Sequence, residues 1–235
     1  MCLEFSMPTF VRLRFSEVFV RLVFAALLVI ASSFAGPTAA AAQSAAPIAQ
    51  GGDAAVALTG FRSAQFGMDE DAVRAAIKTD FGIEGDAVQV GLNTVERTRV
   101  MTIAVPEVLR DGGTAQVSYI FGYQSKALIQ VGILWAPATD PAITDAILYA
   151  NGDVLRAYFD GAGYLPETVS KDVVLENGIL LFRGSDASGH TAILLLQGRF
   201  EETEGLRTLF PTSLTLLYAV SPDKPDILMI NSGDF

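Results

Sequence analysis

The sequence predicts an α+β fold in which two related helix-plus-antiparallel-meander units, in the order αβββ-αβββ, form one duplicated domain. Phe61–Gly82 has the pattern of a capped amphipathic helix, and part of it recurs 82 residues later. Strand-like runs with alternating apolar residues follow both copies. Two units of this length, about 80 residues, are long for a solenoid repeat and indicate an internal duplication. We expect the units to span residues 58–137 and 138–221.

The first helix is predicted to run from Asp69 to about Thr79. Asp69 is a good N-cap because its carboxylate can accept from free N–H groups of the first turn. Glu70 and Asp71 then place negative charge at the positive end of the helix dipole. An apolar face follows at helical spacing, and a glycine ends the helix (Val73, Ala76, Ile77; Gly82).

The sequence Asp153-Val154-Leu155-Arg156-Ala157-Tyr158-Phe159 echoes the first helix. Residues 71–77 share its pattern of Asp, an aliphatic residue two positions on, Arg-Ala, and a large apolar residue. This echo places a second helix at the start of the second unit.

Residues 1–42 have the features of a signal peptide. Arg12, Arg14 and Arg21 form a positive n-region, and Leu22–Gly36 is a 15-residue apolar stretch. Small residues then favour cleavage between Ala42 and Gln43. The alternative is an uncleaved membrane anchor, but a spanning helix requires about 20 strongly apolar residues. We therefore expect a periplasmic or secreted protein whose residues 43–57 are a flexible mature N-terminus.

Composition excludes several classes of function. Without residues 1–42 the chain keeps 13 of 16 Lys/Arg and 24 of 26 Asp/Glu, a net charge of −11. This acidity, without a basic cluster, argues against nucleic acid and against anionic membranes after signal cleavage. The only cysteine, Cys2, lies in the signal segment, so the mature chain has neither disulfides nor thiol chemistry.

The first unit continues with strands predicted at 87–92, 95–105, 114–121 and 127–135. Apolar residues alternate along the last two, which indicates an antiparallel sheet with one buried face (Val117, Tyr119, Phe121; Val131, Ile133, Trp135). A hairpin across Gly122–Lys126 joins these two strands.

The second unit is predicted to open with a helix that has Asp140 as N-cap, Pro141 at the first helical position and Gly161 at its end. Asn151-Gly152 either splits this helix or weakens it. Strands are expected at 168–175, 179–183, 191–197 and 214–220, with a type I′ turn at Asn177-Gly178. Residues 198–212 are predicted as a solvated loop. Residues 222–235 are expected to form a tail, with Ile227–Ile230 as a candidate edge strand.

No constellation of residues points to catalysis, a cofactor or a metal. His190 is the only histidine, and the neighbouring Ser188 lacks the surroundings of a nucleophile elbow. Ser221-Pro222-Asp223-Lys224 matches Ser-x-x-Lys, but it follows a strand instead of opening a helix. Acidic candidates for glycoside cleavage form no evident pair (Glu107, Glu167, Glu176). Asp69-Glu70-Asp71 is better explained as helix N-terminal charge than as a calcium loop. We therefore predict no catalytic, cofactor-binding or metal-binding residue.

Aromatic residues flank the predicted helices and sheet, and most are expected in the core (Phe61, Phe66, Phe81, Trp135, Tyr158, Phe159, Tyr164). Any that remain exposed on a concave sheet would form a surface for a partner or ligand.

The run Phe61…Phe66-Gly67-Met68-Asp69…Val73 resembles a helix-entry motif of small exported bacterial proteins, in which an aromatic precedes Trp/Phe-Gly-Met and an acidic helix start. The helix-plus-meander order resembles the β-lactamase-inhibitor-protein fold, which small lipoproteins of the outer-membrane assembly machinery share in single copy. The motif covers about a dozen residues. The chain departs from these families in having no lipobox cysteine and no disulfides. The resemblance implies an architecture and a compartment, and no functional residue.

The expected function is that of a non-enzymatic exported module of the cell envelope, which binds a protein or a small ligand. Two alternatives remain open. One is an envelope hydrolase that uses carboxylates, which would need two of them with perturbed pKa in a deep cleft. The other is a carrier of a small apolar ligand, which would need an apolar cavity between helix and sheet.

Overall fold

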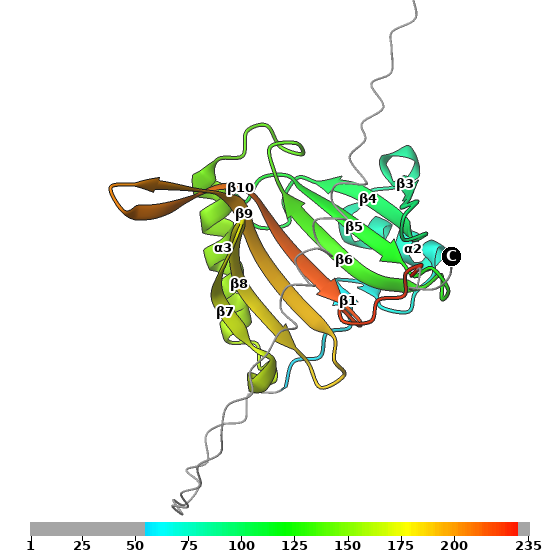
Figure 1. Cartoon of the computed structure of the whole chain (residues 1–235). Helices are drawn as coiled ribbons and strands as arrows, with labels where there is room; N and C mark the ends of the chain where they lie inside the picture. Colours follow the sequence, from blue (N-terminus) through cyan, green and yellow to red (C-terminus); the bar gives the residue numbers. More distant parts are fainter. Residues whose placement is uncertain (1–54, 230–235) are drawn as a thin grey trace, which may run out of the picture. The chain divides into compact units, whose positions relative to one another are not determined.

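A computed structural model describes residues 55–229, which form an α+β fold built on one large antiparallel sheet (Figure 1). The eight strands are ordered β3-β4-β5-β6-β10-β9-β8-β7, and every neighbouring pair is antiparallel. A separate two-stranded sheet pairs β1 (Gly60–Phe61) with β2 (Ala64–Gln65). The predicted signal peptide, residues 43–54 and residues 230–235 lie outside the described residues.

The helix α2 spans Glu70–Phe81, so it forms where predicted but continues past the predicted end at about Thr79. Asp69 is its N-cap, with the side chain accepting a hydrogen bond from Ala72 N at 2.9 Å. Gly82 ends the helix in the left-handed conformation, with φ 66°, which glycine adopts without the steric cost of a Cβ atom. The predicted apolar face of Val73, Ala76 and Ile77 is buried.

The helix α3 spans Asp145–Asp160 and starts later than predicted. Its N-cap is Thr144, whose hydroxyl accepts from Ile147 N at 3.3 Å. The prediction that Asp140 is the N-cap was wrong, because its carboxylate instead accepts from Thr114 N at 2.8 Å and Ala142 N at 3.0 Å. Asp140 thus holds the turn before the helix against the segment that leads into β5.

Asn151-Gly152 does not split α3, because both residues are buried against neighbouring segments. The Asn151 amide donates to Gly112 O at 2.9 Å. A Cβ atom at Gly152 would lie 2.9 Å from Leu181 Cδ1, so glycine permits the helix to approach β8 closely.

Four strands follow each helix, as many as the predicted strand ranges and one more than the predicted αβββ order of a unit. After α2 come β3 (Gln89–Leu92), β4 (Arg99–Val105), β5 (Ala115–Phe121) and β6 (Leu128–Trp135). After α3 come β7 (Ser170–Leu175), β8 (Gly178–Ser185), β9 (Thr191–Thr203) and β10 (Leu206–Ala219). The two sets join at β6 and β10, which pair with Leu216 opposite Ile133. The two predicted units therefore share a single sheet.

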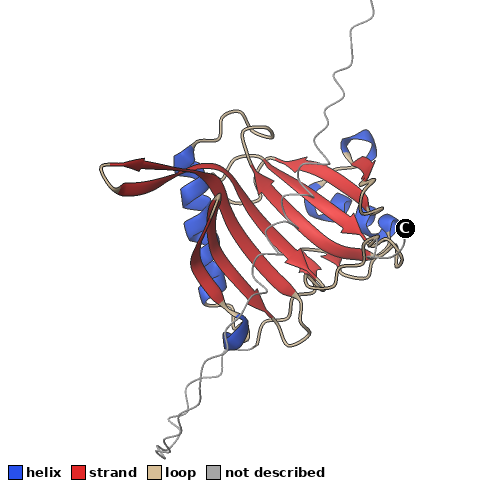
Figure 2. Cartoon of the chain, viewed as in Figure 1, coloured by secondary structure: helices blue, strands red, loops and turns tan. Residues whose placement is uncertain are grey.

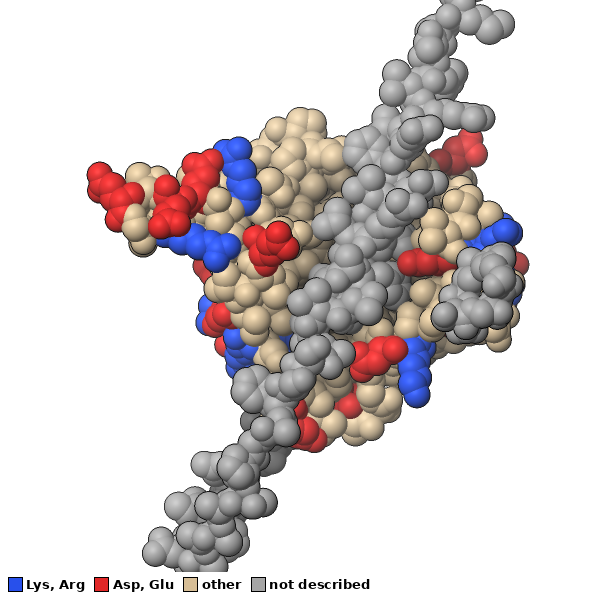
Figure 3. Space-filling model, in the orientation of Figure 1, with Lys and Arg blue, Asp and Glu red and all other residues tan. Residues whose placement is uncertain are grey.

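The prediction of a solvated loop at residues 198–212 was wrong. The two strands β9 and β10 continue through this segment as a hairpin that projects beyond the sheet (Figure 1). Acidic and basic side chains both gather on this hairpin (Figure 3), and Arg207 Cζ lies 3.8 Å from the ring centroid of Phe200. The three glutamates had indicated a loop, whereas two of them pair across the strands, Glu202 with Arg207 and Glu201 with Thr208.

Two smaller predictions also fail. The β7–β8 hairpin forms, but neither Asn177 nor Gly178 has a positive φ, so its turn is not type I′. Residues 227–229 are not a strand, while Ile230 lies outside the described residues.

The core lies between the sheet and the two helices. Both helices lie behind the sheet as drawn in Figure 2, and their buried residues share one cluster with alternate residues of the strands. Tyr119, Ile133 and Trp135 have no exposed surface. The predicted alternation along β5 and β6 is confirmed, since the predicted residues belong to this cluster (Val117, Tyr119, Phe121; Val131, Ile133, Trp135).

Candidate functional site

The sheet has a second face, on the side opposite α2 and α3. Successive residues of a strand point to opposite faces, and directly paired residues point to the same one. Ser118 pairs with Thr102 and Gly132, and Gly132 pairs with Leu217. The central strands therefore present aliphatic and uncharged polar side chains on this face (Val100, Thr102, Gln116, Ser118, Ile120, Gln130, Leu134, Ile193, Leu195, Thr215, Leu217).

The C-terminal strap, which we define as residues 221–228, crosses the end of this face. Asp226 connects it to the β5–β6 turn, since its carboxylate accepts from Gln124 N at 3.0 Å and Ser125 N at 2.9 Å. Farther on, Leu228 N donates to Glu96 O at 2.8 Å, in the β3–β4 turn. The strap thus joins two turns at one end of the sheet.

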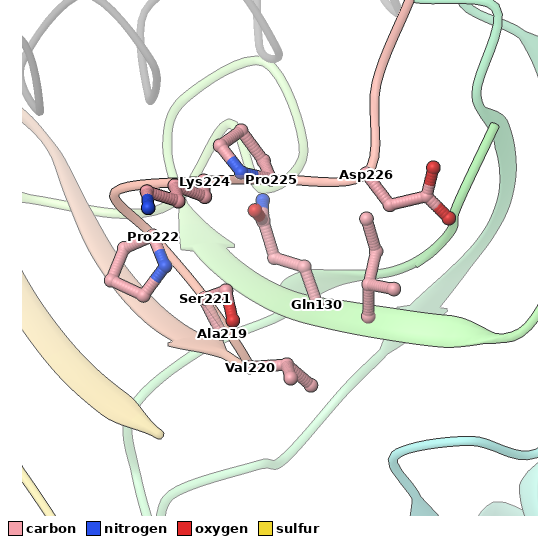
Figure 4. A pocket seen from close by; sticks show the side chains of 9 residues that line it. Gln130, Ala219, Val220, Ser221, Pro222, Lys224, Pro225 and Asp226 are labelled. Carbon is pink, nitrogen blue, oxygen red and sulfur yellow. The ribbon is translucent and has the colours of Figure 1, made fainter. Parts of the chain in front are cut away.

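A cavity of about 100 Å³ lies between the strap and the strands β6 and β10. Its walls are mainly apolar (Ile129, Ala219, Val220, Pro222, Pro225), and its polar groups come from Gln130, Ser221, Lys224 and Asp226. Figure 4 shows the Gln130 side chain rising from β6 to the strap, with Lys224 and Asp226 at opposite ends. Gln130 belongs to the second face because it pairs with Ala219.

The Gln130 side chain is 4% exposed, and it makes no hydrogen bond to another described residue. The hydroxyl of Thr215, on the same face, is also buried and unpaired within residues 55–229. The second face therefore has a buried hydroxyl without a hydrogen bond at Thr215, and at Gln130 a largely buried side chain to which no described residue bonds.

The charged groups that line this cavity among the described residues are Asp226 and Lys224. Burial alone would raise the pKa of Asp226, but hydrogen bonds from the backbone N–H groups of Ser125 and Gln124 outweigh it and lower that pKa. Its charge is thus already compensated by the β5–β6 turn. Lys224 forms no ion pair with a described carboxylate, so it provides the uncompensated charge at the cavity.

Glu96 is a buried acid that the sequence analysis did not single out. It lies in the β3–β4 turn, 8% exposed, and its Oε2 accepts from Asn93 Nδ2 at 2.8 Å. Burial raises the pKa of Glu96 to about 7, although hydrogen bonds to the carboxylate oppose this effect. The predicted strand over 95–105 did not mark Glu96 as buried, and the hydrophilic residues around it gave no signal of burial.

A second cleft, of about 520 Å³, lies beside the C-terminal end of α3. Phe159, Tyr164 and Phe182 form its floor and are themselves buried in the core. The polar side chains at its rim, Asp160 and Lys171, form an ion pair at 2.6 Å. The cleft contains one carboxylate and is open, so it matches neither a two-carboxylate hydrolase site nor an enclosed apolar cavity.

His190 takes part in hydrogen bonds that join two segments of the fold. Its Nδ1 lies 2.6 Å from Leu58 O, and the carboxylate of the nearby buried Asp186 accepts from Leu58 N and His190 N. These bonds attach the start of the described chain to the β8–β9 turn. No hydrogen bond joins the Ser188 hydroxyl to the histidine ring among the described residues.

The structure does not bring the acidic candidates together. Glu107, Glu167 and Glu176 are exposed at three separate connections, after β4, before β7 and between β7 and β8. At the start of α2, Asp69 caps the helix and Glu70 pairs with Arg99 at 2.5 Å. Within residues 55–229, no three His, Cys, Asp or Glu side chains could hold a metal ion together. Neither described helix has the length and apolarity that crossing a membrane requires.

Ser221 and Lys224 lie in one turn of the strap, where Lys224 N donates to Ser221 O at 3.2 Å. They do not open a helix, as the sequence had indicated. The structure does, however, place both at the wall of the strap cavity.

The aromatic residues mostly pack in the core, as expected. Trp135, Phe159 and Tyr164 are buried, and Phe61, Phe66 and Phe81 are partly buried against the same cluster. Tyr158 is 64% exposed, but it lies on α3 and thus away from the second face.

Comparison of the chain with protein-family models, curated proteins and solved structures found no match.

Proposed function

We propose that the chain is a non-enzymatic exported module of the cell envelope that binds a protein partner through the second face of its sheet. The observation that supports this most is the chemistry of that face. Its central strands have aliphatic, amide and hydroxyl side chains without formal charge, while α2 and α3 both pack on the opposite face. Seven of these residues are buried in the structure (Val100, Ser118, Ile120, Gln130, Leu195, Thr215, Leu217). Uncharged, mainly apolar side chains also form the buried centre of protein interaction sites.

A protein partner fits this surface better than the alternatives. Nucleic acid and anionic lipid require clustered positive charge, whereas the mature chain has a net charge of −11 by the counts given above. A small apolar ligand requires a concave pocket that encloses most of its surface. A sheet face several strands wide offers an extended area instead, which suits an uncharged, aliphatic protein segment.

The proposal includes the origin and the compartment of the module. Each half of the sequence contributes one helix followed by four antiparallel strands, and the order β3-β4-β5-β6 and β10-β9-β8-β7 is symmetrical about the centre of the sheet. This order supports an internal duplication related to the β-lactamase-inhibitor-protein-like fold. The proposed export is based on the signal-peptide pattern of residues 1–42. N-terminal sequencing of the protein isolated from the cell envelope should give a chain that begins at Gln43.

The test uses the mature chain, residues 43–235, and two matched arginine substitutions. Leu134→Arg puts a charge on the second face at a half-buried position, and Val154→Arg puts one on the exposed side of α3, where Val154 is 59% exposed. We expect capture from envelope extract, at near-native salt, to be lost with Leu134→Arg and kept with Val154→Arg. Circular dichroism and thermal melting verify that both variants fold.

Two results would contradict the proposal. One is the absence of any captured protein, and the other is capture that survives Leu134→Arg or fails equally with Val154→Arg. Turnover of an envelope polymer by the purified chain would show that it is an enzyme.

A further inference from the structure

We propose that the strap cavity binds the C-terminal residue of a peptide, one with a small side chain such as alanine. Gln130 would bond the last peptide group, Lys224 would pair with the terminal carboxylate, and Pro222 and Pro225 would contact the side chain. This inference rests on the proposed function, since it adds an anchoring point for the partner at the end of the second face.

The buried amide of Gln130 defines the first requirement of the ligand. Its Nε2 donates and its Oε1 accepts, so its complement is a group with a donor and an acceptor side by side, as a peptide group has. Gln130 is 4% exposed, lines the cavity and makes no hydrogen bond to a described residue. A ligand with such a group would therefore form hydrogen bonds with Gln130 that no described residue provides.

The charges define the second requirement. Lys224 is at one end of the cavity and Asp226 is at the other (Figure 4). The oxygens of Asp226 already accept from Gln124 N and Ser125 N. The nearby Asp223 has Arg183 as its partner, at 3.5 Å. An ammonium group beside a buried amide suits a carboxylate that follows a peptide group, which is the arrangement at the end of a peptide chain.

The size defines the third requirement. A cavity of about 150 Å³ can hold benzene, so about 100 Å³ suits a slightly smaller group. Glycine or alanine at a chain end fits this volume. The apolar wall of prolines and aliphatic side chains would receive a methyl group without leaving a polar atom unpaired.

The probes are three small molecules titrated into the ¹⁵N-labelled mature chain. N-acetyl-alanine has the peptide group and the carboxylate, N-acetyl-alaninamide lacks the charge, and N-acetylglucosamine offers an acetamido group on a sugar. The side-chain NH₂ signals of Gln130 report binding directly by NMR. We expect millimolar binding of N-acetyl-alanine, as is usual for so small a ligand, and binding of N-acetyl-alaninamide about tenfold weaker.

Substitutions assign the roles. Lys224→Met should remove the preference for N-acetyl-alanine over N-acetyl-alaninamide. Gln130→Leu should weaken the binding of both probes about tenfold. Gln65→Leu is the matched control, since Gln65 is exposed in β2 and does not line the cavity, and it should leave the binding of both probes unchanged. Lys224 is exposed, so Lys224→Met keeps the test valid even if Gln130→Leu impairs folding.

Three results would overturn this inference: no shift of the Gln130 amide, equal binding of the acid and the amide, or preferred binding of N-acetylglucosamine. If the probes fail while partner capture still depends on Leu134, the inference is rejected and the proposed function stands. If the probes bind but capture does not depend on Leu134, the cavity is a small-ligand site and the proposed function is rejected.

Discussion

Ionisation of Glu96 should destabilise the fold as the pH rises, and Glu96→Gln should remove this effect. The side chain is 8% exposed in the β3–β4 turn, where its backbone oxygen receives the bond from Leu228 N. Its pKa is about 7 in the folded chain against an ordinary value of 4.5. Between these two pH values the folded state binds more protons than the unfolded state. The free energy of unfolding therefore falls as the pH rises through this window.

The expected size follows from the shift of the pKa. Each unit corresponds to 1.36 kcal/mol, so the loss between pH 4.5 and pH 8 is on the order of 3 kcal/mol. Glutamine keeps the shape of the protonated acid and cannot ionise. The free energy of unfolding of Glu96→Gln, relative to that of the parent chain, should therefore increase by about 3 kcal/mol from pH 4.5 to pH 8.

Denaturant unfolding of the mature chain at several pH values measures this difference. The free energies are comparable when the parent chain and the variant show the same dependence on denaturant concentration. Glu176→Gln is the control, because Glu176 is exposed in the β7–β8 turn. The reasoning is refuted if the difference in free energy of unfolding between Glu96→Gln and the parent chain stays constant with pH. It is also refuted if Glu176→Gln shows the same dependence.

Two further predictions concern a helix cap and the strap. Asp69→Ala removes the acceptor for Ala72 N and should lower the free energy of unfolding by about 1 kcal/mol, while Asp69→Asn should retain most of it; an unchanged denaturation midpoint for Asp69→Ala would contradict the capping role. Asp226→Ala removes the acceptor for two backbone N–H groups, so hydrogen exchange at Gln124 and Ser125 should accelerate about tenfold or more. In the parent chain the protection of these two amides from exchange should persist at pH values below the ordinary pKa of aspartate, because the pKa of Asp226 is lowered. Unchanged exchange rates would show that the carboxylate does not hold the strap to the turn.

The local order of the first helix and the central strands follows from residues close together in sequence. Asp69 and Gly82 set the limits of α2 by capping, and the period of two along β5 and β6 sets which side chains face the helices. These signals depend on neighbours within a few positions. The start of α3 was different, because Asp140 resembles an N-cap locally but bonds Thr114, which is 26 positions away.

The candidate site depends almost entirely on such distant contacts. Ser221 and Lys224 stood out in the sequence as a Ser-x-x-Lys match, but Gln130 and Glu96 did not stand out, because nothing near them in the chain marks a buried polar residue. Only the return of residues 221–228 across β6 and the two turns creates the cavity and joins Leu228 N to Glu96 O.

The sequence by itself determined the class of the fold, the pairing of neighbouring strands and the pattern of a signal segment, because composition, caps and periodicity act over short distances. The tertiary structure decided that the two halves share one sheet through β6 and β10, that β9 and β10 extend into a projecting hairpin, and that the strap closes over Gln130. The shared sheet and the strap depend on packing between segments far apart in the chain, where the gain from burial outweighs the local preference of each segment. The projecting hairpin depends on cross-strand pairing of exposed residues instead.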